Sequence, residues 1–411
     1  MVDRRRALQG MGSILALASQ GLVPKRGLAA DLSHLTYGLP EGLYETAELD
    51  ILPGKKPLIK LTYRPPNYET PVSYFESPIT ANDAFFVRYH LADIPQEINL
   101  QSWKLRVDGD GVTTPFELAM ADLQKDFEEV EILAVCQCAG NRRGLSDPHV
   151  PGVQWGLGAM GCAVWKGVRL KDVLAKAGLR KETVEIILTG ADRPTIDKTP
   201  EFIKSIPLWK ALDENTIIAF AMNGEPLPHF NGFPARLIVP GWTATYWMKH
   251  LVTIEASTKP FGGFWVKSAY RVPTGKFPMI QHFLTQMNES SEPITEILVN
   301  SVIASPAEGY KLRPGEPVDV RGVAWDGGYG VRRVEFSTDG GKLWREADLG
   351  KDLGRFAFRS FGFRFVAATP GTYKVMVRAS NALGQTQAES LIFNPAGYHN
   401  NVIRPLTISV V

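Results

Sequence analysis

The sequence predicts an α+β protein with a mixed α/β domain followed by a β-sandwich of immunoglobulin type. Two observations support this fold class. Between about residues 81 and 275, short β-like runs alternate with helical segments, which is typical of a mixed domain. From about 295 to 411 the chain turns into short runs that alternate apolar and polar residues, separated by turn residues. Regularly spaced short strands of this kind predict a sandwich.

The first 30 residues have the pattern of an export signal. Arginines at 4–6 precede an apolar stretch from Met11 to Val23, and small residues at 27–30 suit a cleavage site. The stretch is too short to be a permanent membrane helix. The arginine cluster resembles a twin-arginine signal and predicts a periplasmic protein. A basic start followed by a buried helix is the alternative.

The next segments set the expected domain boundaries. Residues 31–80 are rich in proline and glycine, so we expect an extended N-terminal wrap of a first domain that spans 31–290. In that domain Leu170 to Ala177 have helical apolar spacing, and Gly178 suits the helix end. The strands that we expect are apolar runs at 132–135, 184–188, 217–221 and 237–239.

The remaining residues form a linker and the second domain. We expect 276–300 to be an irregular linker and 295–411 to be the sandwich. The run Asp339-Gly340-Gly341 predicts a hairpin, and the run at 369–371 (Thr-Pro-Gly) predicts another turn.

Composition excludes several classes of protein. The chain has 411 residues, of which 44% are hydrophobic and 21% charged, which is ordinary for a soluble domain. The net charge of +2, without a basic stripe, argues against a nucleic-acid binder. The three cysteines, Cys136, Cys138 and Cys162, leave at least one free thiol that is either a ligand or buried. The chain has no Cys-x-x-Cys-His motif, so we expect no haem attached to it.

One segment combines a thiol with two guanidinium groups. Cys136 to Gly144 reads Cys-Gln-Cys-Ala-Gly-Asn-Arg-Arg-Gly and follows the apolar run at 132–135. Sulfur favours transition metals, and arginine suits oxyanions. We expect Arg142 and Arg143 on an exposed loop near the thiol, where they would favour the thiolate that binds a metal. A buried cysteine acting as a small apolar residue is the alternative.

Three further segments add candidate ligands. The run at 85–90 reads Phe-Phe-Val-Arg-Tyr-His and places Arg88 and His90 on one face of a strand. The run at 231–250 contains a Pro-Gly turn between Arg236 and Lys249, which suits a phosphate-bearing cofactor. The run at 263–271 is Gly-Phe-Trp-Val-Lys-Ser-Ala-Tyr-Arg. Taken alone, each segment also fits ordinary strands and turns.

Together, the four segments resemble the sulfite oxidase family of molybdenum enzymes, over most of the chain after the signal. The run Gln-Cys-Ala-Gly-Asn-Arg-Arg at 137–143 matches the motif that carries the family's molybdenum ligand. The likeness implies that Cys138 ligates molybdenum and that Arg88 and Arg143 clamp the substrate. It also implies that Tyr270 hydrogen-bonds near the reacting oxygen and that Trp155 forms an aromatic wall.

The same resemblance implies a molybdopterin cofactor and the residues that bind it. Arg236 and Lys249 match the family's pterin-binding Arg and Lys, and His90 belongs to the segment that lines the metal. Asp192 matches a pterin contact. Asn231 stands where animal enzymes have a histidine, so that contact differs.

The resemblance also implies an activity and partners. Bacterial sulfite dehydrogenases, which lack a fused haem domain, are the members most like this chain. The implied reaction is oxidation of sulfite to sulfate, with electrons passed to a separate c-type cytochrome, in a homodimer formed by the sandwich. Family members also supply a substrate-site arginine from the C-terminal region, for which Arg404 is the candidate. Nitrate or sulfoxide reduction, oxidation of another sulfur compound, and a non-enzymatic exported binding protein are the alternatives.

Overall fold

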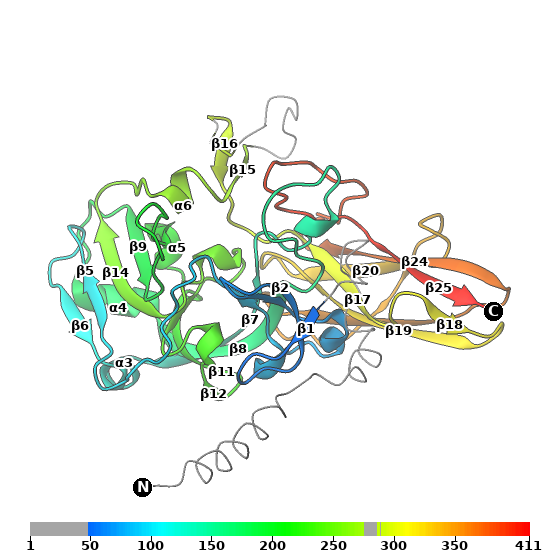
Figure 1. Ribbon diagram of the computed structural model, residues 1–411, viewed down its shortest axis with the longest axis horizontal. Coiled ribbons are helices and arrows are strands. Elements are labelled where there is room, and N and C mark those ends of the chain that lie inside the picture. Colours follow the sequence, from blue (N-terminus) through cyan, green and yellow to red (C-terminus); the bar gives the residue numbers. More distant parts are fainter. Residues whose placement is uncertain (1–47, 275–285, 288) are drawn as a thin grey trace, which may run out of the picture. The chain divides into compact units, whose positions relative to one another are not determined.

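A computed structural model describes residues 48–274, 286–287 and 289–411 (Figure 1). All of these residues belong to one compact unit, Leu35–Val411. The predicted export signal lies outside the described residues. Within them, no helix is long and apolar enough to cross a membrane.

Two five-stranded sheets build the mixed domain. In the first sheet the strands lie in the order β10 (Ile203–Pro207), β9 (Glu185–Gly190), β14 (Leu251–Ser257), β5 (Leu105–Asp108) and β6 (Phe116–Leu118). In the second sheet they lie in the order β12 (Glu225–Pro226), β11 (Ile217–Met222), β8 (Met160–Arg169) and β7 (Glu129–Gln137), and β13 (Arg236–Ile238) also pairs with β11. The four predicted apolar runs all lie in these strands or extend one residue beyond them. The pairing of β14 with β5 is parallel, and the other neighbours in both sheets are antiparallel.

Short helices connect and cover these sheets. They are α3 (Met120–Asp126), α4 (Leu170–Ala177), α5 (Leu208–Ala211) and α6 (Phe264–Lys267), together with the 3-10 turns η2 (Val72–Glu76), η3 (Asn82–Ala84), η4 (Arg143–Leu145), η5 (His229–Asn231) and η6 (Ala244–Tyr246). Helix α4 confirms the predicted helix, and Gly178 ends it with a φ of 69°. Its apolar face is buried, and it packs against β5 and β8 (Figure 1).

The N-terminal part of the described chain is a sheet, so the prediction of an extended wrap was wrong for it. Its strands are β1 (Glu48–Asp50), β2 (Leu58–Thr62), β3 (Asn67–Glu69) and β4 (Val87–Arg88). The proline- and glycine-rich runs that suggested an extended chain form the turns between these strands, for example the turn at residues 63–66.

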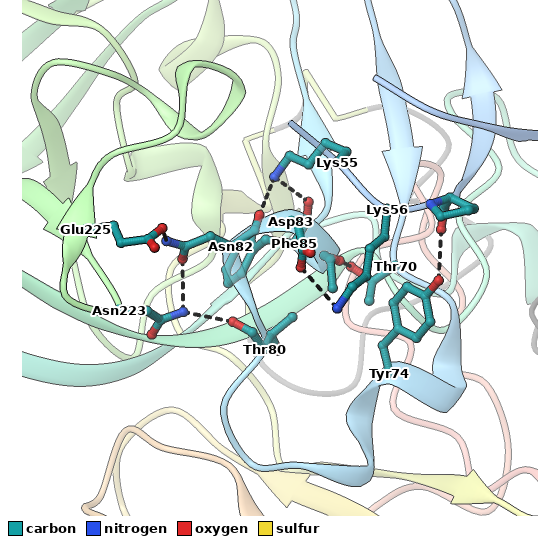
Figure 2. A network of polar contacts seen from close by, with 12 residues as sticks. Lys55, Lys56, Thr70, Tyr74, Thr80, Asn82, Asp83, Phe85, Asn223 and Glu225 are labelled. Atoms are coloured by element: carbon teal, nitrogen blue, oxygen red, sulfur yellow. Dashed lines mark hydrogen bonds and ion pairs between the residues drawn. The ribbon is translucent and has the colours of Figure 1, made fainter. Parts of the chain in front are cut away.

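A polar network fixes the segment that leads into β4 (Figure 2). Lys55 donates hydrogen bonds to the carbonyl oxygens of Asn82 and Phe85, at 2.7 and 3.1 Å. The Asn82 amide donates to the Met222 carbonyl at 2.9 Å, and the Asn223 amide donates to the Asn82 side-chain oxygen at 2.9 Å. Turn η3 is therefore tied to β11, which holds the following strand in place.

Two facing sheets form the second domain, as the alternating pattern predicted. In one sheet the strands lie in the order β17 (Asn300–Ser305), β19 (Pro317–Trp325), β23 (Arg359–Val366) and β22 (Asp348–Leu349). In the other they lie in the order β18 (Tyr310–Leu312), β25 (Pro405–Val410), β24 (Gly371–Asn381), β20 (Val331–Ser337) and β21 (Arg345–Glu346). Inward-facing residues of both sheets form one apolar core, in which the rings of Phe336 and Phe363 stack at 3.9 Å. Both predicted turns connect strands of this domain.

The expected linker is partly structured. Strand β16 (Ser291–Pro293) pairs with β15 (Arg271–Pro273), so the prediction of an irregular segment was wrong there. Residues 276–285 and 288 of the expected linker lie outside the described residues. The period-two pattern was invisible in β16 because the strand has only three residues.

Candidate active site

The cysteine segment follows β7 and is pinned by a neighbouring loop. The Cys138 amide donates to the Ala159 carbonyl at 2.9 Å, and the Asn141 side-chain oxygen accepts from the Ala159 amide at 3.0 Å. The Arg142 amide donates to the Gly156 carbonyl at 2.8 Å. These bonds fix the backbone that carries the Cys138 thiol, directly after the end of β7.

The three cysteines differ in access. All are free thiols; Cys138 is 6% exposed and lines a cavity, whereas Cys136 and Cys162 are fully buried. Burial raises the pKa of the Cys136 thiol and raises that of Cys162 to about 12. Cys138 is therefore the one of these three thiols that lines the cavity, and its role as a metal ligand stays a prediction.

The expectation of an exposed arginine loop was wrong. Arg142 is 1% exposed and Arg143 is 9% exposed. Arg142 donates to the carbonyl oxygens of Ser301 and Val402 in the second domain, at 2.6 and 3.0 Å. Backbone carbonyl groups accept hydrogen bonds from both guanidinium groups, and this is how arginine can be buried without a carboxylate.

The cavity brings together eight of the eleven predicted site residues. They are Arg88, His90, Cys138, Asp192, Asn231, Arg236, Lys249 and Tyr270. These residues come from segments between positions 88 and 270 that the two sheets and the N-terminal sheet bring to one place. The ring of Phe85 packs directly over Gly161 of β8, where a Cβ would lie 2.5 Å from the ring. This close approach sets the position of the strand that carries Arg88.

Positive charge dominates the cavity. Arg88, Arg236 and Lys249 line it, and Asp192 is the one carboxylate among the lining residues that the structure describes. Burial, aided by Arg236, lowers the pKa of Lys249 well below its ordinary value. Burial also raises the pKa of Asp192, although Lys249 opposes that shift. An excess of buried cations is costly unless an anion offsets it.

Hydrogen bonds to each other and to residues that do not line the cavity hold Asn231 and Arg236 in place. Lys55 donates to the Asn231 side-chain oxygen at 2.6 Å, and burial lowers the pKa of Lys55 to about 7. One terminal nitrogen of Arg236 donates to the Asn231 carbonyl at 3.0 Å, and the other to the Cys136 sulfur at 3.2 Å. The Nε of Arg236 is buried and has no hydrogen-bond partner in the described structure.

His90 and Tyr270 form a second pair in the cavity wall. The Tyr270 hydroxyl is hydrogen-bonded to His90 Nε2. The His90 ring stacks on Phe202 with centroids 3.7 Å apart. Burial, followed by the charge of Arg88, lowers the pKa of His90 well below its ordinary value, so His90 is neutral at pH 7. Burial raises the pKa of Tyr270, which keeps its hydroxyl protonated.

Three predicted residues do not line this cavity. Arg143 lies behind it, donating to the Ala396 carbonyl at 2.7 Å and the Val153 carbonyl at 3.1 Å. Trp155 packs edge-on against Phe86 at 6.5 Å and is fully buried. Arg404 donates to the Leu145 carbonyl at 2.6 Å and lies in another small cavity, beside Arg142. Their proposed roles stay predictions.

Sequence reasoning missed several residues of this region. Tyr398, from the C-terminal segment, stacks on Tyr270 with centroids 5.5 Å apart, and the Arg143 guanidinium lies 5.3 Å from the Tyr398 ring centre. Phe202 lines the cavity, and Lys204 lies over the Tyr270 ring. None of them belongs to a local motif, so only the fold reveals their position.

The residues present fit an anionic, metal-bearing cofactor. The cavity offers one accessible thiol, a soft metal ligand, beside three basic side chains and a single carboxylate. The unpartnered Nε of Arg236 is a donor that a ligand oxygen could satisfy. Cys138 would hold the metal, and Arg236 and Lys249 would bind the anionic part of the cofactor.

Comparisons with known proteins agree with this chemistry. Residues 91–265 match the model for the oxidoreductase molybdopterin binding domain, and residues 291–410 match that for the Mo-co oxidoreductase dimerisation domain. The fold and site thus define a molybdopterin-binding oxidoreductase.

Two relatives identify the family within this class of molybdopterin-binding oxidoreductases. The chain is 31% identical to the sulfite oxidase of Arabidopsis thaliana over 328 residues, which cover 76% of this chain and 81% of that one. It is 34% identical to the mitochondrial sulfite oxidase of Rattus norvegicus, covering 72% of this chain but 54% of the rat protein. The chain therefore belongs to the sulfite oxidase family, although it spans only about half the length of the rat relative.

One solved structure is similar in fold over nearly the whole chain. The sulfane dehydrogenase SoxCD from Paracoccus pantotrophus superposes with a TM-score of 0.72 at 26% identity, covering 91% of this chain and 93% of that chain.

Proposed function

We propose that this protein oxidises sulfite to sulfate at a molybdenum–molybdopterin centre held in the cavity by Cys138. The observation that carries the proposal is the set of lining residues, in which one accessible thiol stands among Arg88, Arg236 and Lys249. Sulfite carries two negative charges, which such a cavity attracts. The sulfite oxidase relatives support this substrate.

The residues of the chain bind and orient the reactants. Arg88 binds sulfite oxygens by charge-assisted hydrogen bonds, and Arg143 adds positive charge from behind the wall. The Tyr270 hydroxyl, held by neutral His90, donates a hydrogen bond to an oxygen of the bound substrate. When bound, the metal centre supplies an oxygen atom and accepts two electrons. The half-reaction consumes water and releases two protons and two electrons.

The electrons leave one at a time to a separate c-type cytochrome. We propose that the twin-arginine-like start of the chain exports the folded protein to the periplasm, where such an acceptor is available. We also propose a homodimer through the domain at 295–411, with a catalytic domain at 31–290. The match of 291–410 to a dimerisation domain supports the dimer.

Sulfite-dependent reduction of cytochrome c tests the activity. Protein from a host that makes the molybdenum cofactor should contain about one molybdenum per chain and reduce the cytochrome only when sulfite is added. Nitrate and a sulfoxide, each supplied with a reduced dye, test the alternative reductions. Molybdenum-loaded protein that reduces nitrate or sulfoxide but does not oxidise sulfite would overturn the proposal.

A further inference from the structure

A fully buried lysine stands behind the cavity without an assigned role. Lys204 of β10 is 0% exposed. Its ammonium donates to the backbone carbonyl of Trp265 in α6 at 2.6 Å. Among the described residues, no carboxylate lies within ion-pair distance of it. Burial of an unpaired ammonium is costly, so the surrounding groups must stabilise it in another way.

Aromatic rings surround this ammonium. The nitrogen lies 4.5 Å from the centre of the Tyr246 ring and 5.1 Å from that of Tyr270. Ring faces attract cations within about 6 Å, and the attraction grows when the pair is dry. Lys204 therefore binds one ring of the cavity wall, Tyr270, and the backbone of Trp265.

Both of these partners contact the same cavity residue. Trp265 packs edge-on against His90 at 5.1 Å, and the Tyr270 hydroxyl is hydrogen-bonded to His90 Nε2. Tyr270 also has a left-handed backbone, with a φ of 59°, so its own backbone does not favour this placement. The ammonium thus links the backbone of α6 to the ring of Tyr270, in addition to the direct contact between the Trp265 and Tyr270 rings, whose centroids lie 6.1 Å apart.

We propose that Lys204 is a positioning residue, which holds the Tyr270 ring by a cation–π contact and so keeps the Tyr270 hydroxyl against His90. The inference rests on the proposed function, because it assigns Tyr270 to substrate binding. Lys204 itself does not line the cavity, so we expect it to act through Tyr270.

The charge on Lys204 makes this role depend on pH. Burial, followed by the charge of Arg271, lowers the pKa of Lys204 to about 7. The titratable and charged groups around it are Tyr246, Tyr270, Arg271 and His90. The tyrosines have raised pKa values and His90 a lowered one, so all three are neutral near pH 7. The cation–π contact is therefore present below about pH 7 and lost above it.

Lys210 offers a matched control. It is also a buried lysine beside an aromatic ring, 5.7 Å from the centre of Trp242, and it lies in α5, directly after β10. Unlike Lys204, it forms an ion pair with Asp213 at 2.8 Å. None of its contacts in the described part of the chain reaches Tyr270.

Kinetics of the molybdenum-loaded protein test the proposal. Lys204→Met keeps the unbranched shape of the side chain and removes the charge, so kcat should fall about tenfold at pH 6, whereas Lys210→Met should keep it within about twofold. Wild-type kcat should fall above about pH 7, where Lys204 loses its charge. Lys204→Arg should restore most of the kcat that Lys204→Met loses and should remove this alkaline fall, because arginine stays charged. Wild-type kcat in Lys204→Met, or an unchanged alkaline fall in Lys204→Arg, would overturn the proposal.

A second measurement needs no activity. In cofactor-free full-length protein labelled with 3-fluorotyrosine, the Tyr270 fluorine signal, assigned with Tyr270→Phe, should move in Lys204→Met and stay in place in Lys210→Met. An unmoved Tyr270 signal would contradict the positioning role. If wild-type protein fails to oxidise sulfite, the proposed function fails, and the fluorine signal still reports whether Lys204 holds Tyr270.

Discussion

At the scale of single residues, buried charge organises the site. Glu69 of β3 is 0% exposed, and its two oxygens accept from the backbone amides of Gly156 and Gly158 at 2.7 and 2.6 Å. Burial raises the pKa of Glu69 to about 7, while these amides favour its charged form. Because the loop at 155–159 in turn pins Cys138 and Arg142, Glu69 anchors the position of the thiol from the N-terminal sheet.

Replacing Glu69 with glutamine should therefore destabilise the protein. The amide nitrogen of glutamine cannot accept a hydrogen bond, so one of the two glycine N–H groups would lose its partner in the interior. We expect the free energy of unfolding in urea to fall by about 2–3 kcal/mol. Glu117→Gln, at an exposed position of β6, should change it by less than about 0.5 kcal/mol. Equal effects of the two substitutions would contradict the anchoring role.

Sequence patterns located the residues that line the cavity better than the residues packed around them. Cys138, Arg236 and Lys249 were found because each stands in a local motif. Arg142 and Arg143 were expected to be exposed because charge ordinarily predicts exposure. The carbonyl groups that accept hydrogen bonds from Arg142 lie more than 100 positions away in the sequence, and Arg143 donates to the equally distant Ala396 carbonyl. No local sequence pattern reveals such partners.

At the scale of elements, the turn after β7 is closely packed around Arg143. A Cβ at Gly140 would lie 2.6 Å from both terminal nitrogens of the Arg143 guanidinium, and one at Gly152 would lie 2.9 Å from Nη1. Glycine is required here because the guanidinium passes directly over the backbone. The charge of Arg143 reaches the cavity because these glycines let it lie close behind the wall.

Gly140→Ala should displace the Arg143 guanidinium. We expect a loss of about 1–3 kcal/mol in unfolding free energy and a several-fold rise in the sulfite KM. Gly262→Ala is the control, since a Cβ there meets no atom within 4 Å. Calorimetry and steady-state kinetics measure the two effects. A Gly140→Ala protein with wild-type KM would show that Arg143 does not contribute to substrate attraction.

The elements themselves were predictable to different degrees. Helix α4 was found because its apolar face repeats within eight residues, and the strands of the sandwich were found because alternation is equally local. The sheet at 48–88 was missed because its strands have two to five residues, too few for a period to show. The parallel pairing of β5 with β14 joins residues about 147 positions apart, which periodicity does not encode.

At the scale of the whole molecule, the cysteine loop is bonded to the second domain. Arg142 donates to Ser301 and Val402, and the Asn400 amide donates to the Arg142 carbonyl at 3.0 Å. The Trp325 indole donates to the Gln137 side chain at 2.5 Å, beside the proposed metal ligand. The second domain therefore supports the site as well as providing the proposed dimer contact.

Arg142→Met should weaken this connection. Burying carbonyl groups without their donor should lower the free energy of unfolding by about 3 kcal/mol, and the two domains should unfold at separate temperatures. Arg321→Met, at an exposed position of β19, is the matched control and should leave a single transition. Differential scanning calorimetry distinguishes the outcomes. One unshifted transition in Arg142→Met would show that the domains are held together elsewhere.

The identity of the metal-binding thiol is the central claim for the whole molecule, and metal analysis tests it most directly. Molybdenum should be measured in wild type, Cys138→Ser and Cys136→Ser, each purified from a host that makes the cofactor. Cys136 is fully buried and accepts a hydrogen bond from Arg236, a role that serine can fill. We predict molybdenum near one per chain in wild type and Cys136→Ser, and less than about a tenth of that in Cys138→Ser. Full molybdenum in Cys138→Ser would contradict the account.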